Sequence, residues 1–200
     1  MAASGIDESL ILNPKPVVPV TFSDSRPGEP GLWGCTDFHA LYPIDGKTLM
    51  RSLSDLDSQA GFCPHVTYSA GLQQIPGDPF FQRHLQQLTF DYLFFKLELR
   101  HEMQNYIGTA EDGIGLYLDF RLSRTFYGGL AYSAGSWYLR PMTVGGRQYT
   151  YVRFYFVNCV QGLPEIVKFA MRTFPGLETP ATMNAFYKHA TVLRDAEGVP

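Results

Sequence analysis

The sequence has few charged side chains, and its basic residues form no run. Its 16 lysine and arginine residues are offset by 19 aspartate and glutamate residues, which leaves a formal net charge of -3. Nucleic-acid phosphates are bound by basic stripes, so this composition argues against a nucleic-acid partner. The same shortage argues against an anchor on anionic lipid, although a transient contact with a membrane stays open.

Long apolar runs and paired cysteines are also missing. No window reaches the roughly 18 apolar residues of a membrane span, and residues 1–16 lack the basic and apolar regions of a signal peptide. Cys35, Cys63 and Cys159 are odd in number and lack the two-residue spacing of zinc or redox sites. These absences predict a soluble protein with reduced, buried thiols in the cytoplasm or another reducing intracellular compartment.

No motif predicts a metal, a cofactor or a catalytic nucleophile. Asp37, His39 and His65 are the closest grouping of metal-ligand residue types, but no spacing assembles the three or four ligands that zinc needs. Cys63 precedes a Pro-His pair, and a histidine so near in sequence seldom reaches the thiol as a base. The Gly-Gly pairs lie in hairpin contexts and not in a phosphate-binding loop. We therefore predict no metal site, no cofactor and no catalytic residue.

Aromatic residues, by contrast, are abundant, with 15 Phe and 12 Tyr against only two Trp. Side chains of this kind suit β-strands and the wall of a cavity. A chain of 200 residues can bury one ordinary core without a second domain. Residues 1–30 are rich in proline and predict an extended or disordered arm, which is free or lies on a partner or on the domain's own sheet. We place the domain at residues 31–195 and a tail at residues 196–200.

The middle of the chain alternates between apolar and polar residues, as strands do. The clearest alternation lies in three segments, residues 113–122, 130–140 and 148–157. Residues 32–44 and 65–72 predict two earlier strands, separated by two short helices. Residues 89–100 also alternate and predict one strand, with a helical turn over residues 80–87 before it. The short links predict that these strands are neighbours in one curved antiparallel sheet.

Residues 162–193 predict the helix that this sheet closes on. The first part of the segment has one apolar face, formed by Leu163, Ile166, Val167, Ala170 and Phe174. A Pro-Gly pair at residues 175–176 interrupts the pattern, which predicts either one kinked helix or two helices end to end. Sheet and helix together predict an α+β fold in which a space remains between the two.

Two parts of the chain resemble the START-like superfamily, which includes START lipid-transfer domains, polyketide cyclases and coenzyme-Q-binding proteins. Residues 49–69 are similar to its helix, Asp-x-Asp turn and Pro-x-Val strand start, through Asp55, Asp57, Pro64 and Val66. Residues 136–142 and the Gly-Leu-Pro sequence at 162–164 are similar to its penultimate strand and the start of its last helix. The resemblance implies the helix-grip fold, a curved antiparallel sheet wrapped around a long C-terminal helix, with two short helices after the first strand. It carries no catalytic signature.

In a helix-grip fold the apolar faces of the strands and the helix converge. The residues that we expect to line the interior are Leu93, Phe95, Leu97, Leu118, Phe120, Trp137, Leu139, Val152, Phe154, Ile166, Ala170 and Phe174. They form either a filled core or a pocket for a lipid, sterol, quinone or polyketide. None of these inward positions is titratable, which favours a binding protein over an enzyme.

We therefore predict the binding, and as an extension the transfer, of a hydrophobic small molecule in an internal cavity. Two alternatives stay open, a polyketide cyclase or aromatase that folds a reactive chain and a structural subunit with a filled cavity. On the opposite strand faces, Tyr117 alternates with Asp119 and Arg121. Arg153 stands among Tyr149, Tyr151 and Tyr155. This tyrosine-rich outer face predicts either a solvated surface or a site for a protein partner.

Overall fold

The structure is a computed structural model, and it describes residues 7–17, 20–26, 29–72, 80–92, 95–173 and 178–198. Its strands within these residues are β1 Lys15–Pro16, β2 Thr21–Arg26, β3 Glu29–Tyr42, β4 Val66–Leu72, β5 Phe81–Tyr92, β6 Phe95–Thr109, β7 Leu116–Tyr127, β8 Leu130–Val144 and β9 Arg147–Val160. Its helices are the 3-10 turn η1 Glu8–Leu10, α1 Gly46–Ser54, α2 Gln59–Phe62, α3 Glu165–Thr173 and α4 Glu178–Ala196.

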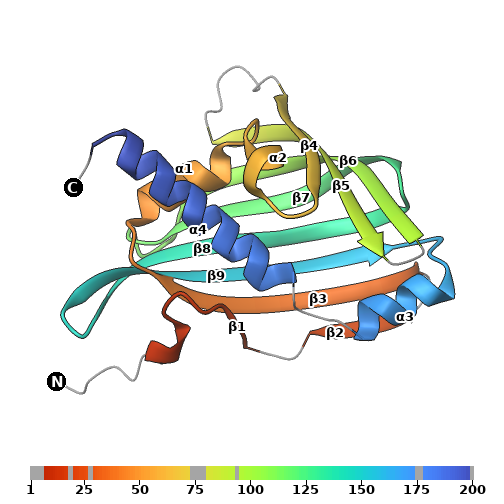
Figure 1. Cartoon of the computed structure of the whole chain (residues 1–200), viewed down its shortest axis with the longest axis horizontal. Helices are drawn as coiled ribbons and strands as arrows, with labels where there is room; N and C mark the ends of the chain where they lie inside the picture. The colour runs from red at the N-terminus through yellow and green to blue at the C-terminus, as the bar shows by residue number, and fades with distance from the viewer. Residues whose placement is uncertain are drawn as a thin grey trace.

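The described strands form one antiparallel sheet in the order β1-β3-β9-β8-β7-β6-β5-β4, with β2 also paired to β3. The first long strand lies against the last one, from Leu32 opposite Val160 to Tyr42 opposite Thr150. The sheet curves, and α4 crosses its concave face while α1 and α2 lie beside α4 (Figure 1). This arrangement confirms the predicted α+β helix-grip fold with two short helices after the first long strand.

Local chemistry explains the turns that set the strand order. Gly145 and Gly146 have φ values of +55° and +78°, which suit a tight hairpin turn and favour glycine. At the hairpin that joins β6 to β7, the Asp112 side chain accepts hydrogen bonds from the backbone N–H groups of Ile114 and Gly115, both at 2.9 Å. These turns place β6 beside β7 and β8 beside β9, and the pairing of β7 with β8 joins the two hairpins, so the apolar sides of all four strands face the same way.

The helix α4 is held against the sheet by its buried side. Met183, Phe186 and Ala190 are buried together with strand residues such as Phe38 and Val152. Polar contacts fix the position of the helix, because Ser52 Oγ of α1 donates to the carbonyl of Phe186 at 2.8 Å. The aromatic rings of Tyr42 and Tyr187 stack with their centroids 4.8 Å apart. One end of the concave face is thereby filled by packed side chains.

The apolar segment 162–193 forms two helices, α3 and α4, and not one kinked helix. It is α4 and not α3 that crosses the concave face (Figure 1), so the helix that the sheet closes on begins at Glu178 and not near residue 162. The predicted inward position of Ile166 is wrong, since its side chain is 69% exposed. Leu163 and Val167 are buried instead, at 8% and 2% exposure. Leu163 precedes α3. Successive helical residues point about 100° apart, so Val167 at the inward position turns its neighbour Ile166 outward.

The prediction of one strand over residues 89–100 is also wrong, as is the helical turn over residues 80–87. The structure has two strands there, β5 and β6, which pair antiparallel with Tyr92 opposite Phe95. The apolar residues that face inward change from even-numbered positions in β5, such as Leu88 and Phe90, to odd-numbered positions in β6, such as Leu97, and a single strand over residues 89–100 does not allow for this change. No proline or glycine marks the change of direction in residues 88–97.

The described part of the proline-rich arm lies on the domain's own sheet. Lys15 pairs with His39 in β1, and Phe22 pairs with Gly34 in β2. Of the arrangements predicted for residues 1–30, the described residues therefore show the one in which the arm lies on the domain's own sheet, where it pairs with β3. The domain limits at residues 31–195 and the tail at 196–200 stay a prediction.

Candidate functional site

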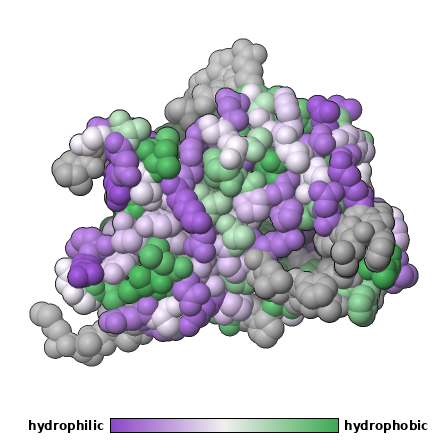
Figure 2. Space-filling model, viewed as in Figure 1, coloured by the Kyte–Doolittle hydropathy of each residue, from purple (hydrophilic) through white to green (hydrophobic). Residues whose placement is uncertain are grey.

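A cavity of about 390 Å³ lies between the concave face of the sheet and the first part of α4. Its wall is mainly aliphatic and aromatic and includes Phe22, Leu32, Leu88, Phe90, Leu99, Met103, Leu130, Phe156, Val160 and Phe186. A hollow is visible right of the centre of the face shown in Figure 2. Val20 and Phe22 come from the N-terminal arm, so this arm forms part of the wall.

Strand alternation decides which side chains reach this cavity. On β6, Leu97, Leu99, His101, Met103 and Asn105 all face it, because every second residue of a strand points to the same side. The intervening residues point to the outer face. There Glu102 accepts hydrogen bonds from Arg83 at 2.6 and 2.8 Å. Charged groups of these two strands are thereby kept outside the cavity.

A small polar cluster interrupts the apolar wall. Asn105 Nδ2 lies 3.1 Å from His84 Nδ1, and His101 lies on the same side of β6 as Asn105. The three side chains are only 3–6% exposed. Within the described residues, His101 Nδ1 and Asn105 Oδ1 have no hydrogen-bond partner. Buried polar atoms in native proteins are usually paired, so these two atoms call for an explanation.

Burial keeps both histidines of this cluster neutral. Desolvation lowers the pKa of His101 to about 4, and desolvation together with the charge of His101 lowers the pKa of His84 to about 4. Neutral imidazoles can donate through one ring nitrogen and accept through the other. The cluster therefore offers hydrogen bonds without a net charge at neutral pH.

The cavity reaches the surface at the start of α4. Glu178 and His65 line the cavity and are partly exposed, and Glu178 Oε2 lies 3.2 Å from His65 Nε2. The His65 ring also stacks on Phe90, with the centroids 4.7 Å apart. Burial raises the pKa of Glu178, while the nearby His65 opposes this rise. These residues form the rim of the cavity.

Only some of the residues predicted to line the interior lie on the cavity wall. Five of them do so, namely Leu97, Leu118, Phe120, Trp137 and Phe154. Leu139 and Val152 were predicted to line it but belong to the filled end of the core, where α1 packs over Leu139. Leu93 and Phe174 lie outside the described residues, as do the side chains of Phe95 and Ala170. Ligand contact by any of these residues stays a prediction.

None of the positions predicted to line the interior is titratable, but the cavity wall includes two histidines that were not among them, His84 and His101. They were missed because residues 80–87 were predicted to form a helical turn and the predicted strand over residues 89–100 ended before His101. A signal was present, since His84 has the parity of Leu88 and Phe90, and His101 has that of Leu97 and Leu99. A hairpin reading of these residues would have placed both histidines inside.

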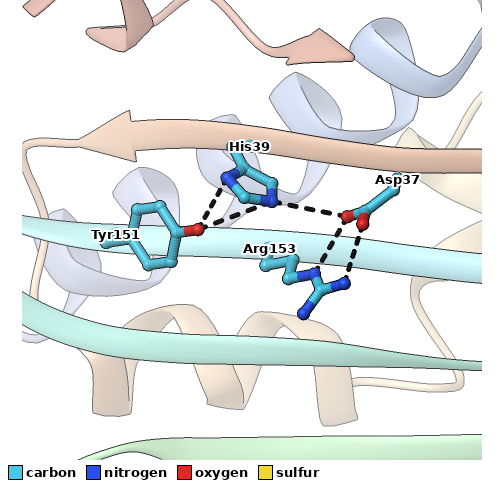
Figure 3. Close-up of polar contacts among 4 residues, drawn as sticks. All are labelled: Asp37, His39, Tyr151 and Arg153. Atoms are coloured by element: carbon cyan, nitrogen blue, oxygen red, sulfur yellow. Dashed lines mark hydrogen bonds and ion pairs between the residues drawn. The ribbon is translucent and has the colours of Figure 1, made fainter. Parts of the chain in front are cut away.

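The sequence grouping of Asp37, His39 and His65 is not brought together. Asp37 and His39 lie on the outer face, where Arg153 donates two hydrogen bonds to Asp37 at 2.9 and 2.7 Å (Figure 3). The Tyr151 hydroxyl lies 2.6 Å from His39 Nδ1, and burial lowers the pKa of His39. Among the described residues, no group of three or more His, Cys, Asp or Glu is placed to hold a metal ion.

The thiols and helices bear on two further predictions. Within the described residues no disulfide joins the cysteines, and burial raises the pKa of Cys63 to about 12, which keeps that thiol protonated. A protonated thiol is a weak nucleophile. The absence of a catalytic residue stays a prediction. In the described part of the chain, no helix has both the length and the apolar character needed to cross a membrane. The cellular compartment stays a prediction.

No protein-family model matches the sequence, and no curated protein matches it. Solved structures do match the fold. A STAR-related lipid transfer protein from Xanthomonas axonopodis superposes with a TM-score of 0.60 at 13% identity, over 86% of this chain and 98% of that one. The Zhui aromatase/cyclase from a Streptomyces species superposes with a TM-score of 0.56 at 12% identity, over 82% and 96% of the two chains.

A third match is a START superfamily protein from Mycobacterium smegmatis, with a TM-score of 0.51 at 12% identity, over 80% of this chain and 98% of that one. At these identities the likeness concerns the fold and not the activity. The features of this chain that define the fold are the single antiparallel sheet and the position of α4 on its concave face. The chain therefore has the START-like helix-grip fold.

Proposed function

We propose that the protein binds a hydrophobic small molecule in the cavity between the sheet and α4. The observation that carries this proposal is the cavity itself, about 390 Å³ with a mainly aliphatic and aromatic wall. Sites for small molecules usually measure about 300–1,000 Å³ and have apolar walls with a few polar groups. The alternative of a structural subunit that binds no ligand requires a filled core, and side chains would then have to occupy this space.

The energetics of the cavity suit such a ligand. Burial of one methylene group contributes about 0.8 kcal/mol, so about ten buried methylenes would supply roughly 8 kcal/mol, the free energy of micromolar binding, before the costs of association. No strong polar contact is required for this affinity. Trp137, stacked on Phe154 at 3.9 Å, gives the wall a large flat apolar surface.

Transfer of the ligand is the natural extension of binding. The rim formed by His65 and Glu178 reaches the surface, so a ligand can leave without unfolding of the sheet. The fold likeness includes a lipid transfer protein, which supports this extension by analogy alone. Exchange of a fluorescent lipid between two vesicle populations would measure it.

Catalysis is a second candidate, and one observation favours it. His84 and His101 face the cavity, and imidazoles are the commonest acid–base groups in enzymes. The likeness to an aromatase/cyclase is compatible with a cavity that folds a reactive chain. Turnover of a short poly-β-ketone thioester, lost in His101→Phe and kept in an outer-face variant, would support this candidate.

The binding proposal is tested with a matched pair of substitutions on β8. Ser133 is buried and lines the cavity, whereas Ser136 lies on the opposite side of the same strand. Ser133→Phe should fill part of the space and abolish ligand binding, while Ser136→Phe should leave it intact. The measurement is mass spectrometry of lipid extracted from the purified proteins, followed by thermal shift with sterols, quinones and fatty alcohols. An empty extract and no shift for the unmodified protein would refute the proposal.

A further inference from the structure

We propose that the ligand is an apolar molecule with one neutral hydrogen-bonding group, a hydroxyl or a carbonyl, and that this group docks on the cluster of His84, His101 and Asn105. The inference rests on the proposed function and names the chemical class of its ligand. It separates alcohols and ketones from two other apolar classes, pure hydrocarbons and free fatty acids. The argument depends on unpaired atoms, on charge and on the position of the cluster.

The unpaired atoms favour a ligand that can form hydrogen bonds. His101 Nδ1 and Asn105 Oδ1 are buried and have no partner in the described part of the chain, although both residues line the cavity. Asn105 uses its Nδ2 toward His84 Nδ1, so its oxygen remains available as an acceptor. A hydroxyl can donate to that oxygen and accept from an imidazole N–H. A hydrocarbon would leave these polar atoms unpaired beside it.

The charges around the cavity disfavour a carboxylate. Among the described residues, the wall includes no lysine or arginine. Its titratable side chains are His84, His101, His65, Glu178, Cys35 and Cys63. Burial lowers the pKa of both cluster histidines to about 4, so neither supplies a positive charge at neutral pH. The one acidic residue, Glu178, would repel an anion at the rim. An ionised head group would therefore lose its water without gaining a counter-charge.

The position of the cluster fits recognition of one end of a molecule. Along β6, Leu97 and Leu99 lie on the wall before His101 and Asn105, and Phe120 of β7 lies beside Asn105. An apolar body can thus extend along the wall while its polar group stays at the cluster. Asn158 Oδ1 on β9 is another unpaired oxygen on the wall. Among the hydrogen bonds of the described residues, none joins Asn158 to a histidine, so it lacks the imidazole that the cluster offers.

The experiment uses three probes that differ only in one end: dodecanol, dodecanoate and dodecane. Binding is followed by the fluorescence of Trp137, which lines the cavity, in a Trp33→Phe background that removes the other indole. At neutral pH we expect dodecanol to bind roughly tenfold more tightly than either of the other probes, which corresponds to about one hydrogen bond. Equal affinities, or tighter binding of dodecanoate, would overturn the inference and leave the proposed function standing. Binding of none of the probes would refute the proposed function instead.

Substitutions then test whether the cluster causes the preference. His101→Phe with Asn105→Leu should reduce the preference for dodecanol to less than about twofold, because the apolar wall is kept while both polar groups are lost. Gln104 lies between His101 and Asn105 in β6 but points to the outer face. Gln104→Leu is therefore the matched control and should keep the preference. His101→Gln retains a hydrogen-bonding group and should keep it as well. If the preference for dodecanol persists in the double variant, or is lost in Asn158→Leu alone, the assignment of the polar group to this cluster is overturned.

Discussion

Glu178 Oε2 lies 3.2 Å from His65 Nε2, so the first residue of α4 is joined to the loop before β4 at the rim of the cavity. Because the Glu178 side chain is 46% exposed, the contact is screened by water and contributes little to stability. We expect Glu178→Gln to leave the melting temperature almost unchanged and to speed ligand dissociation by up to about fivefold, the effect of less than 1 kcal/mol. Stopped-flow fluorescence of Trp137 measures the rate.

The control for this prediction is Glu165→Gln, which removes the partner of Lys168 in α3, where Nζ and Oε1 lie 2.6 Å apart. It changes an exposed ion pair away from the rim. The two variants should therefore differ in dissociation rate and agree in stability. Equal rates in both would show that the rim contact does not restrain the ligand.

Acid should destabilise the protein through the two buried histidines. Their pKa falls from 6.5 to about 4 on folding, so the unfolded state takes up protons first as the pH is lowered. Stability contributed by the neutral side chains is complete above pH 6.5 and decreases down to about pH 4, by about 3 kcal/mol for each histidine. Urea unfolding between pH 7.5 and 4.5 measures this slope, which should be shallower in His101→Phe. A slope unchanged by that substitution would contradict the burial of a neutral His101.

The two sides of α4 should respond differently to truncation. Met183 is fully buried against the sheet, whereas Val192 is 63% exposed on the same helix. We expect Met183→Ala to lower the free energy of unfolding by about 2–5 kcal/mol, and Val192→Ala to change it by less than about 0.5 kcal/mol. Chemical denaturation gives both values. Similar losses in the two variants would mean that α4 does not rest on the sheet through the Met183 side.

The ion pair on the outer face should stabilise the fold without affecting the ligand. Asp37 is only 8% exposed, and both of its oxygens accept hydrogen bonds from Arg153 (Figure 3). Arg153→Leu leaves this carboxylate without them and should cost about 1–3 kcal/mol of stability. The double variant Asp37→Asn with Arg153→Leu should recover part of the loss, and dodecanol affinity should not change. A single variant as stable as the original protein would show that the pair is worth nothing.

The general fold could be predicted from the sequence because each strand with one buried side has a strict alternation. Residues of β8 and β9 such as Trp137 and Phe154 were placed inside correctly for this reason. The hairpin of β5 and β6 was missed because no glycine or proline separates the two strands. The inward residues change from even-numbered in β5, such as Leu88 and Phe90, to odd-numbered in β6, such as Leu97, and this change of phase was overlooked. For the same reason His84, His101 and Asn105 were not predicted to line the cavity. They are polar, and a pattern based on hydropathy assigns polar residues to the outer face.

The extent of the cavity could not be predicted at all. Leu139 and Phe154 lie on the same side of the sheet and in similar sequence patterns. Leu139 is nevertheless covered by α1, whereas Phe154 lines the cavity. Which end of a concave face is filled depends on where the short helices pack, and that depends on contacts between distant parts of the chain. Ile166 illustrates the same limit on a helix, because two adjacent apolar residues compete for one inward position.

The pairing of β3 with β9 also constrains how the chain reaches this structure. Leu32 and Val160 are neighbours in the sheet although they are far apart along the chain, and α4 follows both strands. Contacts between such distant segments slow folding, because a long loop must close before they form. During synthesis on the ribosome the concave face therefore stays uncovered until β9 and α4 have emerged. During that period the apolar side chains that later line the cavity are exposed to water. A chaperone that covers them would then protect the chain against aggregation.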